Sequence, residues 1–146
     1  MSRRTRRPQR PAPAPTRITM ESPCPCGLPA GYGACCGRLH AGTANAPTCE
    51  ALMRSRYAAF VVRDAPYLLR TWHPETRPPA VDFDPALHWV RLEILDTADG
   101  SPFHTTGTVT FRAHYTDNGR PGSLHEHSRF VRHHGVWVYA EAVFAE

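Results

Sequence analysis

The segment Thr108-Val109-Thr110-Phe111-Arg112-Ala113-His114-Tyr115 alternates polar and apolar side chains at every position. Such a period of two is typical of a strand with one buried face, because successive side chains point to opposite sides of a sheet. Val90, Leu92 and Ile94 alternate with charged residues in the same way. Both segments therefore predict half-buried strands.

Two further runs of this kind, 127–132 and 136–144, follow toward the C-terminus. Asp117-Asn118-Gly119 and His133-His134-Gly135 stand between the runs, where a hairpin needs its turn. The chain from His88 onward therefore predicts an antiparallel meander of about four strands.

Upstream of the strands the apolar residues recur with the helical period. Thr48 suits an N-cap, and one face then carries Leu52, Met53, Tyr57, Phe60 and Val61, which predicts an amphipathic helix of about four turns. A shorter helix is expected over 65–72, with Pro66 in its first turn and His73-Pro74 as its stop. Residues 75–86, rich in Pro and Asp, predict a loop.

Two helices followed by about four strands predict an α+β domain. We expect the long helix to pack its Tyr57 and Phe60 face on the apolar side of a curved sheet. A concave space would remain, lined by the polar side chains that the strands direct inward.

Four cysteines within thirteen residues precede these helices, as Cys24-Pro-Cys26 and Cys35-Cys36 around a turn rich in Gly and Pro. Thiolates that bracket a turn of this length can converge on one tetrahedral Zn²⁺. We therefore predict a structural zinc knuckle with Cys24, Cys26, Cys35 and Cys36 as ligands. Four thiolates leave no open coordination position, so zinc catalysis is not expected. His40 is a spare candidate ligand or a solvated linker residue.

The net charge of +4 is concentrated at the N-terminus. All 17 basic residues are arginine, and six of them lie in the first 17 positions, which leaves 11 arginines against 13 acidic residues in the remainder. The body is therefore not a basic nucleic-acid binder, and only the Arg- and Pro-rich leader, residues 1–20, could contact nucleic acid. This leader is expected to be disordered.

Targeting signals are not apparent in the sequence. The basic N-terminus lacks the apolar segment of a signal peptide, and no run approaches the ~18 apolar residues of a membrane span. We therefore expect a soluble, cytoplasmic protein with free thiols and no membrane partner. Cys49 is expected to be a buried structural thiol.

Several segments of the chain follow one another in a distinctive order. They are Cys-Pro-Cys-Gly at 24–27 with Tyr32 and Cys35-Cys36-Gly37, Leu52-Met53-Arg54-Ser55-Arg56-Tyr57, Tyr67-Leu68 with Thr71-Trp72-His73-Pro74, and His125-Glu126-His127-Ser128-Arg129-Phe130 before Gly135-Val136-Trp137-Val138-Tyr139. In these segments the sequence resembles the YchJ family. The resemblance implies a SEC-C zinc knuckle at 21–45, similar to that of the translocation motor SecA. It also implies a cystatin-like or nuclear-transport-factor-2-like (NTF2-like) cone at 46–146, which agrees with the α+β prediction.

The knuckle departs from the usual SEC-C pattern in its turn. Leu28-Pro29 stands where Ser-Gly is usual, no lysine is present, and Cys36 replaces a histidine that many SEC-C motifs carry as the last ligand. The four ligand positions are intact, so the resemblance still implies zinc binding, but not the partner contacts of the basic turn residues.

Two functions from different classes fit these features. The first, which we favour, is a zinc-stabilised, non-catalytic interaction or accessory module of bacteria that binds a protein partner through the knuckle, with a role at the ribosome or in protein export. A homodimer is a further arrangement open to it. The second is an enzyme or small-molecule-binding protein that uses the cone.

The second function rests on six polar side chains expected near the cone pocket. They are His73, His125, Glu126, His127, Arg54 and Arg56. His125 and His127 share one strand face and could act as an acid/base pair, while Glu126 points the other way. Structural roles compete with this interpretation: His73 as a helix cap, and the two arginines in ion pairs with acids such as Glu126.

Overall fold

The structure, a computed structural model, describes residues 17–146, so most of the predicted leader lies outside the described residues. Four antiparallel strands form one sheet in the order β1-β2-β3-β4, which confirms the predicted meander. The elements in chain order are a 3₁₀ turn Tyr32–Ala34, α1 Cys36–His40, α2 Cys49–Val62, α3 Ala65–Arg70, β1 Leu87–Asp99, β2 Thr106–Asp117, β3 Arg120–His133 and β4 Val136–Ala145.

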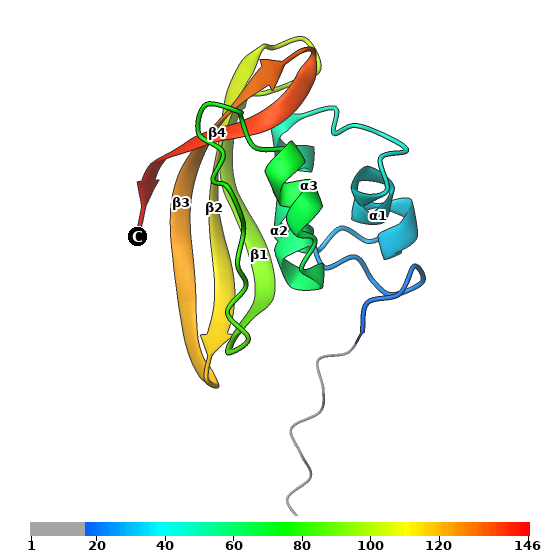
Figure 1. Cartoon of the computed structure of the whole chain (residues 1–146), viewed down its shortest axis with the longest axis vertical. Coiled ribbons are helices and arrows are strands. Elements are labelled where there is room, and N and C mark those ends of the chain that lie inside the picture. Colours follow the sequence, from blue (N-terminus) through cyan, green and yellow to red (C-terminus); the bar gives the residue numbers. More distant parts are fainter. Residues whose placement is uncertain (1–16) are drawn as a thin grey trace, which may run out of the picture.

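The molecule has three layers (Figure 1). The curved sheet forms one side, α2 lies against its concave face with α3 packed on α2, and the cysteine-bearing segment with α1 lies on the opposite side of these helices. The predicted α+β architecture, helices on a curved antiparallel sheet, is confirmed.

Two tight turns set the register of the sheet. Asn118 and Gly119 have φ values of 50° and 82°, and His134 and Gly135 have φ values of 52° and 80°. Positive φ at both central residues matches the twist of the flanking strands in a two-residue hairpin. Both turns lie where the sequence predicted them.

β1 contains two bulges that the alternating pattern did not reveal. The pairing with β2 shifts between Trp89 and Arg91 and again between Ile94 and Asp96. The extra residue at the first shift is Val90, which is 59% exposed, whereas Trp89 packs on the core. The prediction that Val90 shares a half-buried face with Leu92 and Ile94 is therefore wrong, because a bulge reverses the alternation.

Helix α2 begins at its predicted cap, where the Thr48 side chain accepts from the Ala51 N–H at 3.1 Å. Leu52, Met53 and Tyr57 of the predicted face are buried. The other side of the helix is buried as well, because Ala58 packs among the cysteines of the N-terminal segment. The helix is thus covered on two sides.

The start of α2 is attached to the C-terminal end of β1 and the N-terminal end of β2. The Cys49 N–H donates to the Gly100 carbonyl at 3.0 Å. A Cβ added to Gly107 would lie 2.5 Å from the Gly100 backbone and 2.8 Å from the Cys49 Sγ. This close approach buries Cys49, as expected, and burial raises its thiol pKa to about 12.

Candidate functional site

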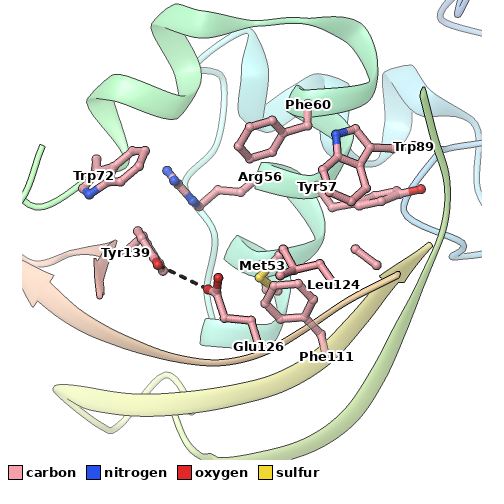
Figure 2. A pocket seen from close by; sticks show the side chains of 11 residues that line it. Met53, Arg56, Tyr57, Phe60, Trp72, Trp89, Phe111, Leu124, Glu126 and Tyr139 are labelled. Carbon is pink, nitrogen blue, oxygen red and sulfur yellow. Dashed lines mark hydrogen bonds between the residues drawn. The ribbon is translucent and has the colours of Figure 1, made fainter. Parts of the chain in front are cut away.

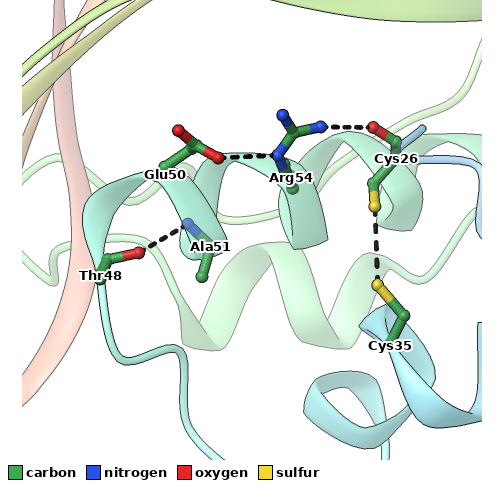
Figure 3. Close-up of polar contacts among 6 residues, drawn as sticks. All are labelled: Cys26, Cys35, Thr48, Glu50, Ala51 and Arg54. Atoms are coloured by element: carbon green, nitrogen blue, oxygen red, sulfur yellow. Dashed lines mark hydrogen bonds and ion pairs between the residues drawn. The ribbon is translucent and has the colours of Figure 1, made fainter. Parts of the chain in front are cut away.

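Four cysteine thiols converge beside α2. The Sγ atoms of Cys24, Cys26, Cys35 and Cys36 all lie within 4.8 Å of one another. Those of Cys26 and Cys35 are 3.6 Å apart (Figure 3). Zn–S bonds near 2.3 Å place tetrahedral thiolates about 3.8 Å apart. The arrangement therefore fits one metal ion, and within residues 17–146 no other cluster of three or more such ligands occurs.

A tight loop brings the first two cysteines into place. The Cys24 N–H donates to the Ala30 carbonyl at 2.9 Å, and Pro23 and Gly31 form an antiparallel bridge. Gly27, directly after the second cysteine, has a φ of 91°, which glycine adopts without steric strain. The Cys-Pro-Cys-Gly sequence thus turns back on itself with both thiols on the inside.

Residues upstream of the predicted knuckle boundary at 21 contribute to it. The Gly33 N–H donates to the Met20 carbonyl at 2.9 Å, and Ile18 packs on the buried cluster that contains three of the cysteines. The folded unit therefore begins before residue 21.

The thiols influence one another's ionisation. A hydrogen bond from the Cys36 thiol lowers the pKa of Cys26 to about 5, whereas burial raises the pKa of Cys35 to about 11. Thiolates this close repel each other, so all four cannot ionise together near neutral pH without a cation. A divalent ion that coordinates thiolates well, such as Zn²⁺, would offset this repulsion.

His40 joins the knuckle to the helical layer. Its Nε2–H donates to the Ser55 carbonyl at 2.8 Å, which leaves Nδ1 to accept from the Tyr32 hydroxyl at 2.5 Å. The ring also packs on Tyr67, with centroids 4.6 Å apart. His40 is therefore neither a spare ligand nor a solvated linker residue. Burial lowers its pKa, which favours the neutral ring that this bonding needs.

Arg54 makes a second connection between knuckle and helix (Figure 3). Its Nη1 donates to the Cys26 carbonyl at 2.8 Å, and its Nε pairs with Glu50 at 3.0 Å. The side chain points to the knuckle rather than to the cone. The structure therefore corrects the prediction that Arg54 supplies positive charge to the pocket.

A separate cavity of about 170 Å³ lies between α2 and the concave face of the sheet (Figure 2). Its walls are mainly apolar and aromatic, with two side chains that are charged at neutral pH, Arg56 and Glu126. The other lining residues are Met53, Tyr57, Phe60, Trp72, Trp89, Phe111, Ala113, Leu124 and Tyr139. A mostly apolar cavity with few polar groups is the usual form of a small-molecule site.

Arg56 is 4% exposed and lies between two aromatic rings. Its Cζ is 5.0 Å from the centre of the Trp72 ring and 4.8 Å from that of Tyr139. Nη1 donates to the Leu68 carbonyl at 2.8 Å and to the Thr71 hydroxyl at 2.7 Å. Burial lowers the pKa of Arg56 to about 10, so the guanidinium remains charged at neutral pH.

Glu126 reaches the cavity from β3, on the face of that strand opposite to His125 and His127. It lies opposite Phe111 on the core face of the sheet. Its Oε2 accepts from the Ser128 hydroxyl and, at 3.2 Å, from the Tyr139 hydroxyl (Figure 2). The predicted ion pair with Arg56 does not form in the structure, since none of the ion pairs among the described residues includes either side chain.

The three candidate histidines do not line the cavity. His125 and His127 lie opposite Arg112 and Thr110, on the face of the sheet away from the helices. Both rings contact Phe144 there. The prediction that they face the pocket is therefore wrong, because alternate residues of β3 point to opposite faces and Glu126 is the one on the cavity side.

His73 is also outside the cavity lining. Its N–H donates to the Tyr139 carbonyl at 2.8 Å, and its Nδ1 accepts from the Glu75 N–H at 3.1 Å. The neighbouring residue, Trp72, lines the cavity instead.

The family model described as the middle NTF2-like domain of YchJ matches residues 48–142. This match covers the α2 to β4 unit that carries the cavity. The chain belongs to the YchJ family. The resemblance identified from the sequence segments is therefore confirmed.

Similar proteins occur in several bacteria. A UPF0225 protein of Streptomyces coelicolor is 67% identical over 124 residues, covering 85% of this chain and 97% of the relative. A UPF0225 protein of Corynebacterium glutamicum is 50% identical over 117 residues, covering 80% and 93%.

Two solved structures share the fold. The solution structure of a SEC-C motif containing protein from Rhodopseudomonas palustris has 35% sequence identity and a TM-score of 0.71, covering 82% of this chain and 95% of that one. The crystal structure of a SEC-C motif containing protein from Psychrobacter arcticus has 24% identity and a TM-score of 0.70, covering 84% and 82%. The second likeness concerns the fold alone.

None of the helices in residues 17–146 has the length and apolar character needed to cross a membrane.

Proposed function

We propose that this YchJ-family chain is a zinc-stabilised accessory protein whose knuckle is structural and non-catalytic. The observation that supports this most directly is the convergence of four thiols, three of them buried, within 4.8 Å. Cys24, Cys26, Cys35 and Cys36 would hold the ion. When bound, Zn²⁺ would neutralise the thiolates and link the two ends of the knuckle. Four sulfur ligands leave no position for water or substrate.

The cytoplasm is the compartment that suits this chemistry. All five cysteines are free thiols, and Cys49 lies outside the four-cysteine cluster. Reducing conditions keep such thiols available to a metal, whereas an oxidising compartment favours disulfides.

Metal content of untagged protein purified without added zinc, together with a count of free thiols, tests the metal assignment. We expect about one zinc per chain, with Cys49 as the thiol that reacts only after unfolding. Cys26→Ser should abolish zinc binding, and Cys49→Ala, the matched control, should leave it unchanged. Metal-free protein with five titratable thiols would contradict the proposal.

We further propose that the knuckle binds a protein partner, with ribosomal or export factors as the first candidates to examine. The support is its exposed apolar surface, since Leu28 at the turn is 41% exposed and Met20 is 59% exposed. Leu28→Asp should abolish cross-linking to the partner while zinc content is retained. Phe103→Asp, at a 96% exposed position in the β1–β2 connection, is the matched control. Equal loss in both variants would contradict a knuckle-specific contact.

A second candidate function is binding of a small molecule in the cone cavity. The observation that favours it is the buried guanidinium of Arg56 on the wall of a mostly apolar cavity. Ala113 lines the same cavity, so Ala113→Leu would fill part of it. A ligand that raises the unfolding temperature of the unmodified chain and leaves that of Ala113→Leu unchanged would support this function. Equal shifts in both proteins would contradict it.

A further inference from the structure

The cone cavity contains a buried cation without a carboxylate partner. No carboxylate among residues 17–146 forms an ion pair with Arg56, whose hydrogen-bond acceptors are the uncharged Leu68 carbonyl and Thr71 hydroxyl. Burying a guanidinium away from water is unfavourable unless charge and hydrogen bonding compensate. The two aromatic rings compensate in part.

Part of the guanidinium remains free to bind a ligand. The two hydrogen bonds of Arg56 both start from Nη1, so Nε and Nη2 form none within the described residues. Every fully buried side-chain nitrogen and oxygen of these residues has a hydrogen-bond partner. Nε and Nη2 are therefore not fully buried atoms, and the cavity is a space that Arg56 lines. A fork of N–H groups matches the two oxygens of a carboxylate.

Glu126 limits the charge that the cavity accepts. This carboxylate lines the same space and already accepts hydrogen bonds from Ser128 and Tyr139. It is only half-buried, whereas Arg56 is buried. A ligand with one negative charge near Arg56 gains from the cation, but a second negative charge would face Glu126. A cationic ligand would instead enter beside the buried guanidinium.

The remaining walls determine the body of the ligand. Aromatic rings of Phe60, Trp89 and Phe111 border the space. The volume of about 170 Å³ is on the scale of the ~150 Å³ apolar cavities that take up benzene. A flat, apolar body of one ring fits this size.

We propose that the cavity binds a small monocarboxylate with a flat apolar body, its carboxylate on the Nε and Nη2 edge of Arg56 and its body against Phe60, Trp89 and Phe111. This inference rests on the second candidate function above and names its ligand class.

Benzoate is a suitable probe, with uncharged benzamide and cationic benzylammonium as controls of nearly the same shape. Ligand-observed NMR on the full chain, together with the fluorescence of Trp72 and Trp89, measures binding. We expect benzoate to bind at least tenfold more tightly than either control, because only benzoate places charged oxygens on the guanidinium. Ala113→Leu should abolish benzoate binding.

Arg56 also supports α3 through Leu68 and Thr71, so its removal would disturb the fold. Glu126→Gln is the sharper variant, since its amide oxygen can still accept from Ser128 and Tyr139. Loss of the negative charge should tighten benzoate binding by about threefold or more. Weaker benzoate binding in Glu126→Gln would overturn the proposed orientation.

The three probes separate failure of this inference from failure of the function on which it rests. If benzamide or benzylammonium binds in the cavity as well as or better than benzoate, the ligand class is wrong while small-molecule binding stands. If none of the three changes the tryptophan signal at millimolar concentration, both the ligand class and the second candidate function are contradicted.

Discussion

The Tyr32 hydroxyl donates to Nδ1 of His40 at 2.5 Å, across the junction between the cysteine knuckle and the helical layer. The Nε2–H of the same imidazole donates a hydrogen bond to the Ser55 carbonyl at 2.8 Å. One histidine therefore links the knuckle turn to the middle of α2. The knuckle and the cone are thus joined by a directional polar contact in addition to apolar packing.

Tyr32→Phe should lower the free energy of unfolding by about 1–3 kcal/mol, because Nδ1 of a partly buried ring would lose its donor. Urea unfolding at pH 8 measures the change. Tyr115→Phe is the matched control, since the Tyr115 hydroxyl forms no hydrogen bond among the described residues, and it should change stability by less than about 0.5 kcal/mol. Equal effects would show that the link contributes little.

His40 should make stability depend on pH. Burial holds its pKa below the ordinary value of 6.5, so the folded state binds the proton less readily than the unfolded chain. The contribution of neutral His40 to the free energy of unfolding is therefore fully present above pH 6.5, and it is lost as the pH falls through the folded-state pKa. The unfolding free energy of His40→Gln should decrease less between pH 8 and pH 5.5 than that of the unmodified chain. Thiol protonation affects both proteins alike, so parallel pH profiles would contradict the assignment.

Arg54 should affect metal retention through its hydrogen bond to the Cys26 carbonyl. Groups that orient a ligand typically change metal affinity by about 10–100-fold. Arg54→Met should therefore release zinc to a competing chelator at a lower concentration. Glu50→Gln removes the ion pair but leaves the bond to Cys26, and it should retain zinc like the unmodified chain. Identical chelator titrations for Arg54→Met and the unmodified chain would contradict this role.

Gly107→Ala should destabilise the fold by about 2 kcal/mol or more, because its Cβ would meet the Gly100 backbone at 2.5 Å. Gly119→Ala is the comparison, since its Cβ has open space and only the positive φ opposes it, at about 1 kcal/mol. Thermal unfolding of both variants measures the difference. A smaller loss of stability in Gly107→Ala than in Gly119→Ala would show that the backbone near Gly100 and Gly107 moves apart easily to accept the added Cβ.

Val90→Ser tests the first bulge of β1. The side chain is 59% exposed, so the substitution should change the unfolding free energy by less than about 0.5 kcal/mol. Val109→Ser, at a buried position of the neighbouring strand, should cost about 2 kcal/mol or more. Comparable losses of unfolding free energy in the two variants would show that Val90 is buried in the core, which would contradict the bulge.

Several local features were predictable from the chain alone, because each depends on neighbouring residues. The cap at Thr48 and the turn at Asn118-Gly119 follow from backbone preferences over three or four residues. The four clustered cysteines lie within thirteen residues around one turn, so their spacing alone indicated convergence. The alternation of β3 indicated that Glu126 and the two histidines lie on opposite faces, but not which face is inward.

Only the tertiary structure decided the remaining placements, because they depend on partners far away in the sequence. His40 meets Ser55 through the docking of one layer on another, and Arg54 and Arg56 diverge to the knuckle and the cavity although they are two residues apart on α2. The bulge at Val90 depends on pairing with β2. The sequence by itself thus determined the strands, the turns and the cysteine cluster through local preferences. Long-range packing decided which polar side chains share a site, since helix docking and strand register set the direction of each one.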